Sequence, residues 1–213
     1  MNDLGISKET INLVEECEEE LEELFKVHED IAQYNQHKVL QAFRNNEVAL
    51  RHFSASSGYG YEDESKLKLD SVYASAFGCE DAIVRPQIVS GTHCLSICLF
   101  GLLRPGDTML CATGTPYDTI QKTIGIKEAK GSLKEWGIGY SQVDLIDNEE
   151  IDIRKITSML ANDTDIRLVY FQRSRGYANR KTIDIDTMAR AFKEIKKINE
   201  DVIILVDNCY GEF

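Results

Sequence analysis

Short apolar runs alternate with amphipathic stretches from about residue 66 onward, and this alternation constrains the fold more than any other feature. We expect strands at AIVRPQIV, DTMLCA, IRLVYFQ and VIILVD, and a strand or loop at GIGYSQVDL. Helical patterns fill the intervals, at residues 66–77, 90–103, 117–124, 151–161 and 184–198. Such β-α-β repetition predicts an α/β fold with a mostly parallel sheet and helices on both faces. The run VIILV is apolar throughout, which predicts a strand buried on both sides.

The residues before this alternation have a helical pattern. From Ser7, a plausible N-cap, to about Ala49, apolar residues recur near a period of 3.6. The acidic run EECEEELEE is interpreted as a solvated face. The loop HFSASSGYGYEDES then breaks the pattern. We therefore expect an N-terminal helical segment at residues 1–57 and part of an α/β domain at residues 58–213.

Charge and composition exclude several classes of partner. The net charge is −12, and the basic residues are scattered, so we expect neither nucleic acid nor an anionic membrane as a partner. No apolar run approaches the roughly 18 residues of a spanning helix, and the N-terminus lacks a secretory pattern, which predicts a soluble, cytoplasmic protein. The six cysteines form no CxxC pair and no metal-ligand spacing with the four histidines. We expect reduced, buried thiols and no metal site.

The turn into the predicted helix at residue 90 is a candidate anion site. Ser90, Gly91 and Thr92 combine small side chains and hydroxyls with backbone N–H groups that have no partner inside a helix. A phosphate would fit there. An ordinary strand-to-helix turn with a Ser cap explains the same residues equally well. His93 is better interpreted as a capping or supporting residue than as part of a hydrolase triad, because no acid is assigned to orient it.

Two further candidates follow predicted strands. Tyr117 comes after the loop CATGTP, where open α/β sheets form ligand crevices and an aromatic ring could stack on a planar ligand. A loop tyrosine can equally be a packing residue. Asp207 ends the apolar strand, and a carboxylate there needs a cationic or hydrogen-bonding partner. A protonated heterocyclic nitrogen would serve, as would an arginine; a simple loop cap is the alternative.

Three arginines cluster directly after the strand IRLVYF, at Arg173, Arg175 and Arg180. A guanidinium binds carboxylates and phosphates through two hydrogen bonds, so this position favours a substrate carboxylate or a phosphate. Exposed arginines paired with the many acidic residues are the alternative.

Seven segments together resemble one enzyme family. They are SGYGYED, FGCEDAIVRPQIVSGTH, LLRPGDTML, GTPYDT, GSLKEWGI, FQRSRGYANR and VDNCYGEF. The chain is similar, from about residue 40 to its end, to methionine γ-lyase family proteins of the aluminium-resistance type. These belong to the pyridoxal-phosphate (PLP) enzymes of cysteine and methionine metabolism.

The resemblance implies a fold-type I PLP-dependent transferase-like fold and assigns roles by position. Residues 90–93 would hold the cofactor phosphate, Tyr117 would stack on its ring, and Asp207 would pair with the protonated ring nitrogen. The resemblance also implies that Tyr59 and Tyr61 reach a neighbouring subunit's cofactor in a homo-oligomer, a dimer or tetramer. The resemblance further implies that Arg173 and Arg175 contact the cofactor or the carboxylate of an amino-acid substrate.

The sequence departs from the family pattern in two places. EDESKLKLD stands where relatives carry a Gly-Arg-Asp-like stretch, so the phosphate contact that an arginine would supply there is not assigned. The family's Schiff-base lysine lies beyond VDNCYGEF, so no catalytic residue can be assigned. We expect an incomplete large domain without the C-terminal domain, and an inactive chain.

The resemblance implies a reaction for the complete enzyme, namely β- or γ-elimination from sulfur amino acids. Two alternatives remain open. One is a different fold-type I reaction, such as transamination or retro-aldol cleavage, because a fold does not choose its chemistry. The other is a non-catalytic oligomerisation module.

Overall fold

The computed structural model describes residues 5–55 and 63–211. The chain divides into two compact units, the first ending at Pro86 and the second beginning at Gln87. The boundary expected between residues 57 and 58 falls outside the described residues and stays a prediction. Each unit is described by itself. No helix within the described ranges is long and apolar enough to cross a membrane.

The first unit consists of helices. Helix α1 spans Lys8–Asn45, the 3₁₀ turn η2 spans Leu50–Phe53, and helix α2 spans Glu64–Phe77. The expected cap is present, since the Ser7 side chain accepts a hydrogen bond from the Thr10 N–H at 3.2 Å. A small core joins α1 to α2 through Ala42, Val72 and Ala76.

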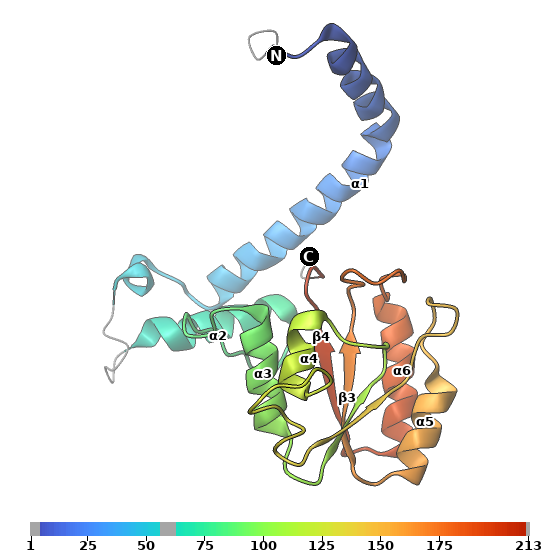
Figure 1. The fold of residues 1–213 in the computed structure, drawn as a ribbon. Coiled ribbons are helices and arrows are strands. Elements are labelled where there is room, and N and C mark those ends of the chain that lie inside the picture. The colour runs from blue at the N-terminus through green and yellow to red at the C-terminus, as the bar shows by residue number, and fades with distance from the viewer. Residues whose placement is uncertain (1–4, 56–62, 212–213) are drawn as a thin grey trace. The chain divides into compact units, whose positions relative to one another are not determined.

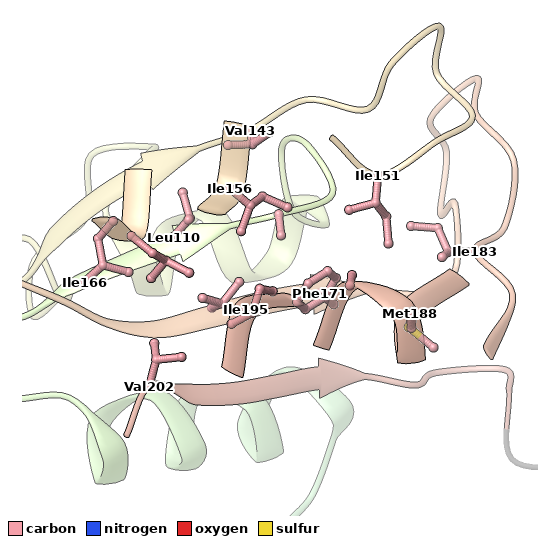
Figure 2. Close-up of a cluster of buried hydrophobic side chains, with 14 residues drawn as sticks. Leu110, Val143, Ile151, Ile156, Ile166, Phe171, Ile183, Met188, Ile195 and Val202 are labelled. Atoms are coloured by element: carbon pink, nitrogen blue, oxygen red, sulfur yellow. The ribbon is translucent and has the colours of Figure 1, made fainter. Parts of the chain in front are cut away.

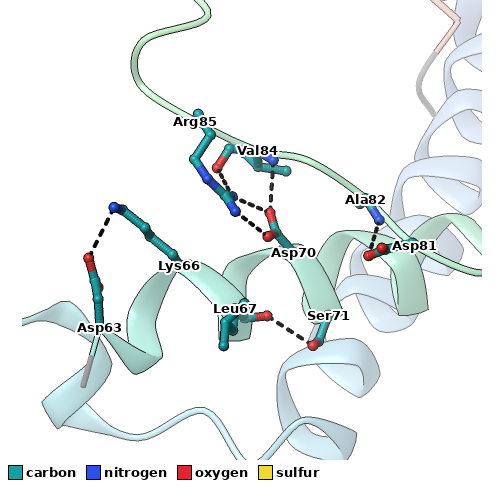
Figure 3. A network of polar contacts seen from close by, with 9 residues as sticks. All are labelled: Asp63, Lys66, Leu67, Asp70, Ser71, Asp81, Ala82, Val84 and Arg85. Carbon is teal, nitrogen blue, oxygen red and sulfur yellow. Dashed lines mark hydrogen bonds and ion pairs between the residues drawn. The ribbon is translucent and has the colours of Figure 1, made fainter. Parts of the chain in front are cut away.

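The segment after α2 corrects the sequence-based prediction, because residues 82–89 do not form a strand. A side chain bonds to the backbone of this segment instead: the Asp70 carboxylate accepts a hydrogen bond from the Val84 N–H at 2.8 Å. Arg85 binds the same carboxylate through two nitrogens, at 2.5 and 2.7 Å (Figure 3). These bonds to Arg85 hold the pKa of Asp70 below its usual value. Because the Val84 N–H is bonded to Asp70 and Pro86 has no N–H, neither residue can donate to a neighbouring strand.

The second unit contains a four-stranded parallel sheet in the order β2-β1-β3-β4. The strands are β1 (Thr108–Cys111), β2 (Gly139–Gln142), β3 (Ile166–Gln172) and β4 (Ile203–Asp207). The helices are α3 (Gly91–Leu102), α4 (Asp118–Ile124), α5 (Ile153–Asn162) and α6 (Ile185–Ile198). The predicted α/β class is confirmed.

Helices cover both faces of this sheet, as predicted (Figure 1). Side chains alternate along a strand, so β3 contributes side chains to the core on each face of the sheet. Leu168 and Tyr170 pack with residues of α3 and α4. Val169 and Phe171 pack with residues of α5 and α6, in the larger core that Figure 2 shows. The two cores hold β3 rigidly and fix where its carboxyl end lies.

Two burial predictions were wrong. Within the described chain β4 is an edge strand, so residues 203–207 are half-buried, although Val202 is fully buried. The cysteines are free, as expected, but only Cys111 is buried; Cys98 is half-buried and the others are exposed. On α1 and α3, apolar neighbours in sequence did not place Cys17, Cys94 and Cys98 in a core, because a helix presents adjacent residues to different sides.

Candidate functional site

A cavity of about 360 Å³ lies where parallel strands end. The chain leaves β1 toward β2 and leaves β3 toward β4, so the strand order reverses between the neighbours β1 and β3. Open α/β sheets bind ligands at such a reversal, beyond the carboxyl ends of the strands. The lining residues are Ser90, Gly91, Thr92, Leu95, Tyr117, Thr119, Ile120, Gln172, Ser174, Gly176, Tyr177, Asp207, Cys209 and Tyr210.

The first turn of α3 forms one wall of the cavity. Ser90 caps the helix, and its side chain accepts from the His93 N–H at 3.1 Å. The N–H groups of Gly91 and Thr92 have no carbonyl partner within a helix. A Cβ at Gly91 would meet no atom within 4 Å, so the backbone there is open to a ligand. The hydroxyls of Thr92 and Thr119 lie 2.7 Å apart and add a second pair of polar groups.

Tyr117 precedes α4 and is held by the loop that follows β3. Its ring stacks on the Tyr177 ring, with centroids 5.7 Å apart and an interplanar angle of 29°. The neighbouring Tyr177 side chain raises the pKa of Tyr117 to about 12. The Tyr117 N–H donates to the Gln172 side chain at 2.6 Å. This ring is therefore fixed by contacts from one loop.

Asp207 ends β4 with its carboxylate in the same cavity. The Tyr170 hydroxyl donates to one carboxylate oxygen at 3.1 Å, and the Cys209 N–H donates to the other at 3.1 Å. Burial raises the pKa of Tyr170, so its hydroxyl keeps its proton and remains a donor. Each carboxylate oxygen thus accepts one hydrogen bond and retains lone pairs for a ligand.

Three residues predicted for the site do not line the cavity. The His93 ring accepts the Val89 N–H at 3.4 Å, which is the capping role considered from the sequence. Arg173 donates to Asn208, at 3.0 Å, and to the carbonyls of Gly211 and Ile183.

Arg175 lies in a separate groove beside Arg180 and Lys181. Tyr59 and Tyr61 fall outside the described residues. The cofactor and substrate contacts assigned to these residues stay predictions.

Sequence reasoning missed several lining residues. Gln172 is the last residue of β3 and was interpreted only as part of that strand. Thr119 lies two residues after Tyr117 and could have been found from that spacing. Gly176 and Tyr177 lie in the arginine-rich loop, and no periodicity or capping pattern in that loop indicates a ligand contact.

The chemistry of this cavity fits PLP. A helix N-terminus and hydroxyls suit a dianionic phosphate, an aromatic ring suits a planar heterocycle, and a carboxylate suits a protonated ring nitrogen. The volume of about 360 Å³ lies in the range of small-molecule pockets. No group of three or more potential metal ligands occurs among residues 5–55 and 63–211.

Comparison with known proteins identifies the family of this chain. The methionine gamma-lyase family profile matches residues 10–213. The uncharacterized protein YnbB of Bacillus subtilis (strain 168) is 44% identical over 200 residues, which cover 93% of this chain and 47% of that protein.

Two solved structures have closely similar folds. One, from Clostridium acetobutylicum, is provisionally named a cystathionine beta-lyase involved in aluminum resistance; its TM-score is 0.93 at 44% identity over 100% of this chain and 51% of that one. The other is a carbon-sulfur lyase involved in aluminum resistance from Clostridium novyi NT, with a TM-score of 0.92 at 43% identity over 99% and 50% of the two chains.

A more distant structure shares the fold alone. It is the pyridoxal-5'-phosphate dependent protein YhfS from Escherichia coli, at 18% identity and a TM-score of 0.60, covering 83% of this chain and 44% of that one. The parallel sheet with its strand-end cavity is thus an incomplete large domain of the fold-type I PLP-dependent class. Within that class, the chain belongs to the methionine gamma-lyase family. It spans about half the length of these relatives.

Proposed function

We propose that this chain binds PLP in the strand-end cavity and forms most of the cofactor site of a carbon–sulfur lyase. One observation carries the proposal: Thr92, Tyr117 and Asp207 come from three separate parts of the second unit and line the same cavity. Each supplies a different group that PLP needs, and the parallel sheet brings them to one edge.

Each of these residues has a distinct task. The first turn of α3, with the hydroxyls of Thr92 and Thr119, binds the phosphate. Tyr117 covers the ring and excludes water from one face. Asp207, held by Tyr170, keeps a proton on the ring nitrogen by opposing its charge. When bound, PLP draws electrons away from the α-carbon of an amino acid, which is the chemistry that elimination requires.

We further propose sulfur amino acids as substrates of the whole protein, with β- or γ-elimination as the reaction. The names of the two Clostridium relatives support a carbon–sulfur lyase. No lysine is among the described residues that line the cavity, so the task proposed for this chain is to bind and orient the cofactor. Its free cysteines favour a reducing compartment, which supports a cytoplasmic location.

Titration of the chain with PLP tests the proposal. We expect saturable binding, followed by absorbance and fluorescence, and a loss of affinity of about tenfold or more in Asp207→Ala, because an uncompensated ring charge would remain. Asp201→Ala is the matched control, since Asp201 is exposed and precedes β4, at the opposite end from Asp207. Equal affinity in both variants would contradict the assigned site.

Product analysis separates the possible reactions of the whole protein. Elimination from cystathionine, cysteine or methionine yields a thiol or hydrogen sulfide together with a keto acid. A transaminase would instead need a second keto acid and release no sulfur product.

Helix α1 favours a second role in assembly. Its apolar side chains Leu13, Leu21, Leu24, Phe25 and Ile31 are between 41% and 59% exposed. A helix with such a face is stable only when another surface covers it. We propose a second copy of this chain as that cover, in a homo-oligomer. Sedimentation should show a dimer or larger species that Leu24→Glu dissociates and that Glu22→Gln leaves intact.

A further inference from the structure

Gln172, the last residue of β3, has both ends of its side-chain amide occupied. The amide oxygen accepts the Tyr117 N–H at 2.6 Å, and the amide nitrogen donates to the Ser174 carbonyl at 2.9 Å. The residue is 5% exposed. A buried amide with its oxygen and nitrogen directed to different partners has one orientation, because the reverse orientation would leave both partners unpaired.

The Gln172 backbone is fixed as firmly as its side chain. Its N–H donates to the Thr113 hydroxyl at 3.0 Å, in the loop after β1. Arg180 donates to the carbonyls of Gln172 and Ser174, at 2.8 and 2.5 Å. Gln172 therefore ties the ends of β1 and β3 together at the point where the strand order reverses.

The bond from Gln172 matters because the start of α4 has no side-chain cap of its own. Helix α4 begins at Asp118 and Tyr117 is its N-cap residue, and the Tyr117 N–H donates to the distant Gln172 side chain. The separation is 55 residues in sequence. Only the folded sheet brings this acceptor to the start of α4.

The loop beyond Gln172 holds the Tyr117 ring as well as its backbone. Gly176 has a φ of +56°, and a Cβ there would lie 2.9 Å from Cδ2 of Tyr117, too close for any other residue. Tyr177 stacks on the ring. The segment 172–177 thus holds Tyr117 at its backbone, at its ring edge and on one ring face.

From this geometry we infer that Gln172 is the positioning residue for Tyr117, setting the plane in which the tyrosine ring meets a planar ligand. The inference rests on the proposed function, in which that ligand is PLP. Gln172 also lines the cavity, but the task assigned here acts through Tyr117.

Two substitutions at Gln172 separate positioning from general packing. Gln172→Met keeps the size but loses both hydrogen bonds. Gln172→Glu keeps the acceptor for the Tyr117 N–H and loses the donor to Ser174. Gln142→Met is the matched control: Gln142 is likewise the last residue of a strand, β2, and its amide bonds to other side chains, but it does not line the cavity.

The first measurement is PLP affinity together with the induced circular dichroism of bound PLP, which reports how its ring lies relative to the protein. We expect Gln172→Met to weaken binding about tenfold, the effect of one buried hydrogen bond, and to lose most of the induced signal. Gln172→Glu should retain the signal, and Gln142→Met should match the unsubstituted chain. A folded Gln172→Met variant with unchanged affinity and signal overturns the inference.

Amide hydrogen exchange of Tyr117 provides a second measurement that does not need a ligand. We expect Gln172→Met to accelerate exchange of the Tyr117 N–H about tenfold relative to the other amides of α4, and Gln142→Met to leave it unchanged. If the unsubstituted chain fails to bind PLP, the proposed function fails, whereas the exchange result still decides the inference. Unchanged protection in Gln172→Met would overturn it.

Discussion

Helix α1 and strand β3 are both rich in apolar residues, but only β3 is buried within the described chain. Phe25 on α1 is 46% exposed, whereas Phe171 on β3 is fully buried and packs edge-on against Phe192, with ring centroids 5.1 Å apart. The difference arises because β3 has helices on both faces, while α1 contributes only Ala42 to a core. An apolar pattern therefore indicates that a face needs cover without indicating what provides it.

The contrast is expected to be largest in thiol reactivity. Cys17 on α1 is exposed, and Cys111 at the end of β1 is buried, which raises the pKa of its thiol. We expect Cys17 to react with DTNB at least about a thousandfold faster, because Cys111 needs unfolding before it reacts. Peptide mapping after timed labelling gives both rates. Similar rates would show that the sheet core opens readily.

Truncation of the two phenylalanines tests the same contrast in stability. Phe171→Ala should lower the free energy of unfolding by about 3–5 kcal/mol, because it leaves a cavity between two packed layers. At chain concentrations too low for assembly, Phe25→Ala should change it by less than about 0.5 kcal/mol, because its side chain packs in no core of the single chain and is 46% exposed. Fluorescence of the single tryptophan, Trp136, follows urea unfolding of Phe171→Ala, and far-UV circular dichroism of the helices follows that of Phe25→Ala. A large effect of Phe25→Ala at such low concentrations would contradict the expected contrast, whereas an effect that appears only as the chain assembles agrees with a second copy covering α1.

The Asp70–Arg85 pair gives the first unit a pH-dependent contribution to stability. The folded pKa of Asp70 lies below its unfolded value, so the contribution is present above the ordinary carboxyl pKa near 4 and is lost as pH falls through the folded pKa. Asp70→Asn should therefore lower the urea midpoint at pH 7, by less than Phe171→Ala does, and the difference should vanish at low pH. Far-UV circular dichroism follows the helices.

Asp81→Asn is the control for this experiment, since the Asp81 carboxylate accepts the exposed Ala82 N–H next to it and acts on Arg85 through charge alone, without the hydrogen bonds that Asp70 makes. A difference between the wild-type chain and Asp70→Asn that grew toward low pH would contradict the sign of the Asp70 shift.

The smallest expected effect is at the two serine caps. Ser90→Ala at α3 should cost about 1 kcal/mol, because that helix is packed against the sheet and the lost bond leaves the His93 N–H without its acceptor. Ser7→Ala at α1 should cost less than about 0.5 kcal/mol, because an exposed helix end frays locally without unfolding the chain. Urea unfolding of both variants gives the comparison, and equal costs would show that the two helix ends are equally anchored.

Much of the fold could be predicted from the sequence. Periodicity predicts every helix of the second unit and three of its four strands, with β2 predicted only as a strand or loop. The reason is that buried elements carry apolar patterns that depend only on local geometry. The error at residues 82–89 came from an apolar run whose backbone bonds to Asp70, a residue 14 positions away from Val84. No local pattern reveals that the pairing group is a side chain.

The candidate site divides in the same way. Ser90, Thr92, Tyr117 and Asp207 could be named because each follows or precedes a recognisable element, and the parallel sheet places such ends at one edge. Gln172 and Tyr170 could not be named, because their tasks depend on bonds to residues 55 and 37 positions away.

The sequence by itself determined the α/β class, the resemblance to the methionine gamma-lyase family, and which chemical groups end the strands. Only the tertiary structure decided which of those groups share a cavity and in what orientation. The reason is physical: periodicity and capping act over a few residues, whereas the plane of Tyr117 depends on Gln172, whose hydrogen bond exists only after β1 and β3 have paired.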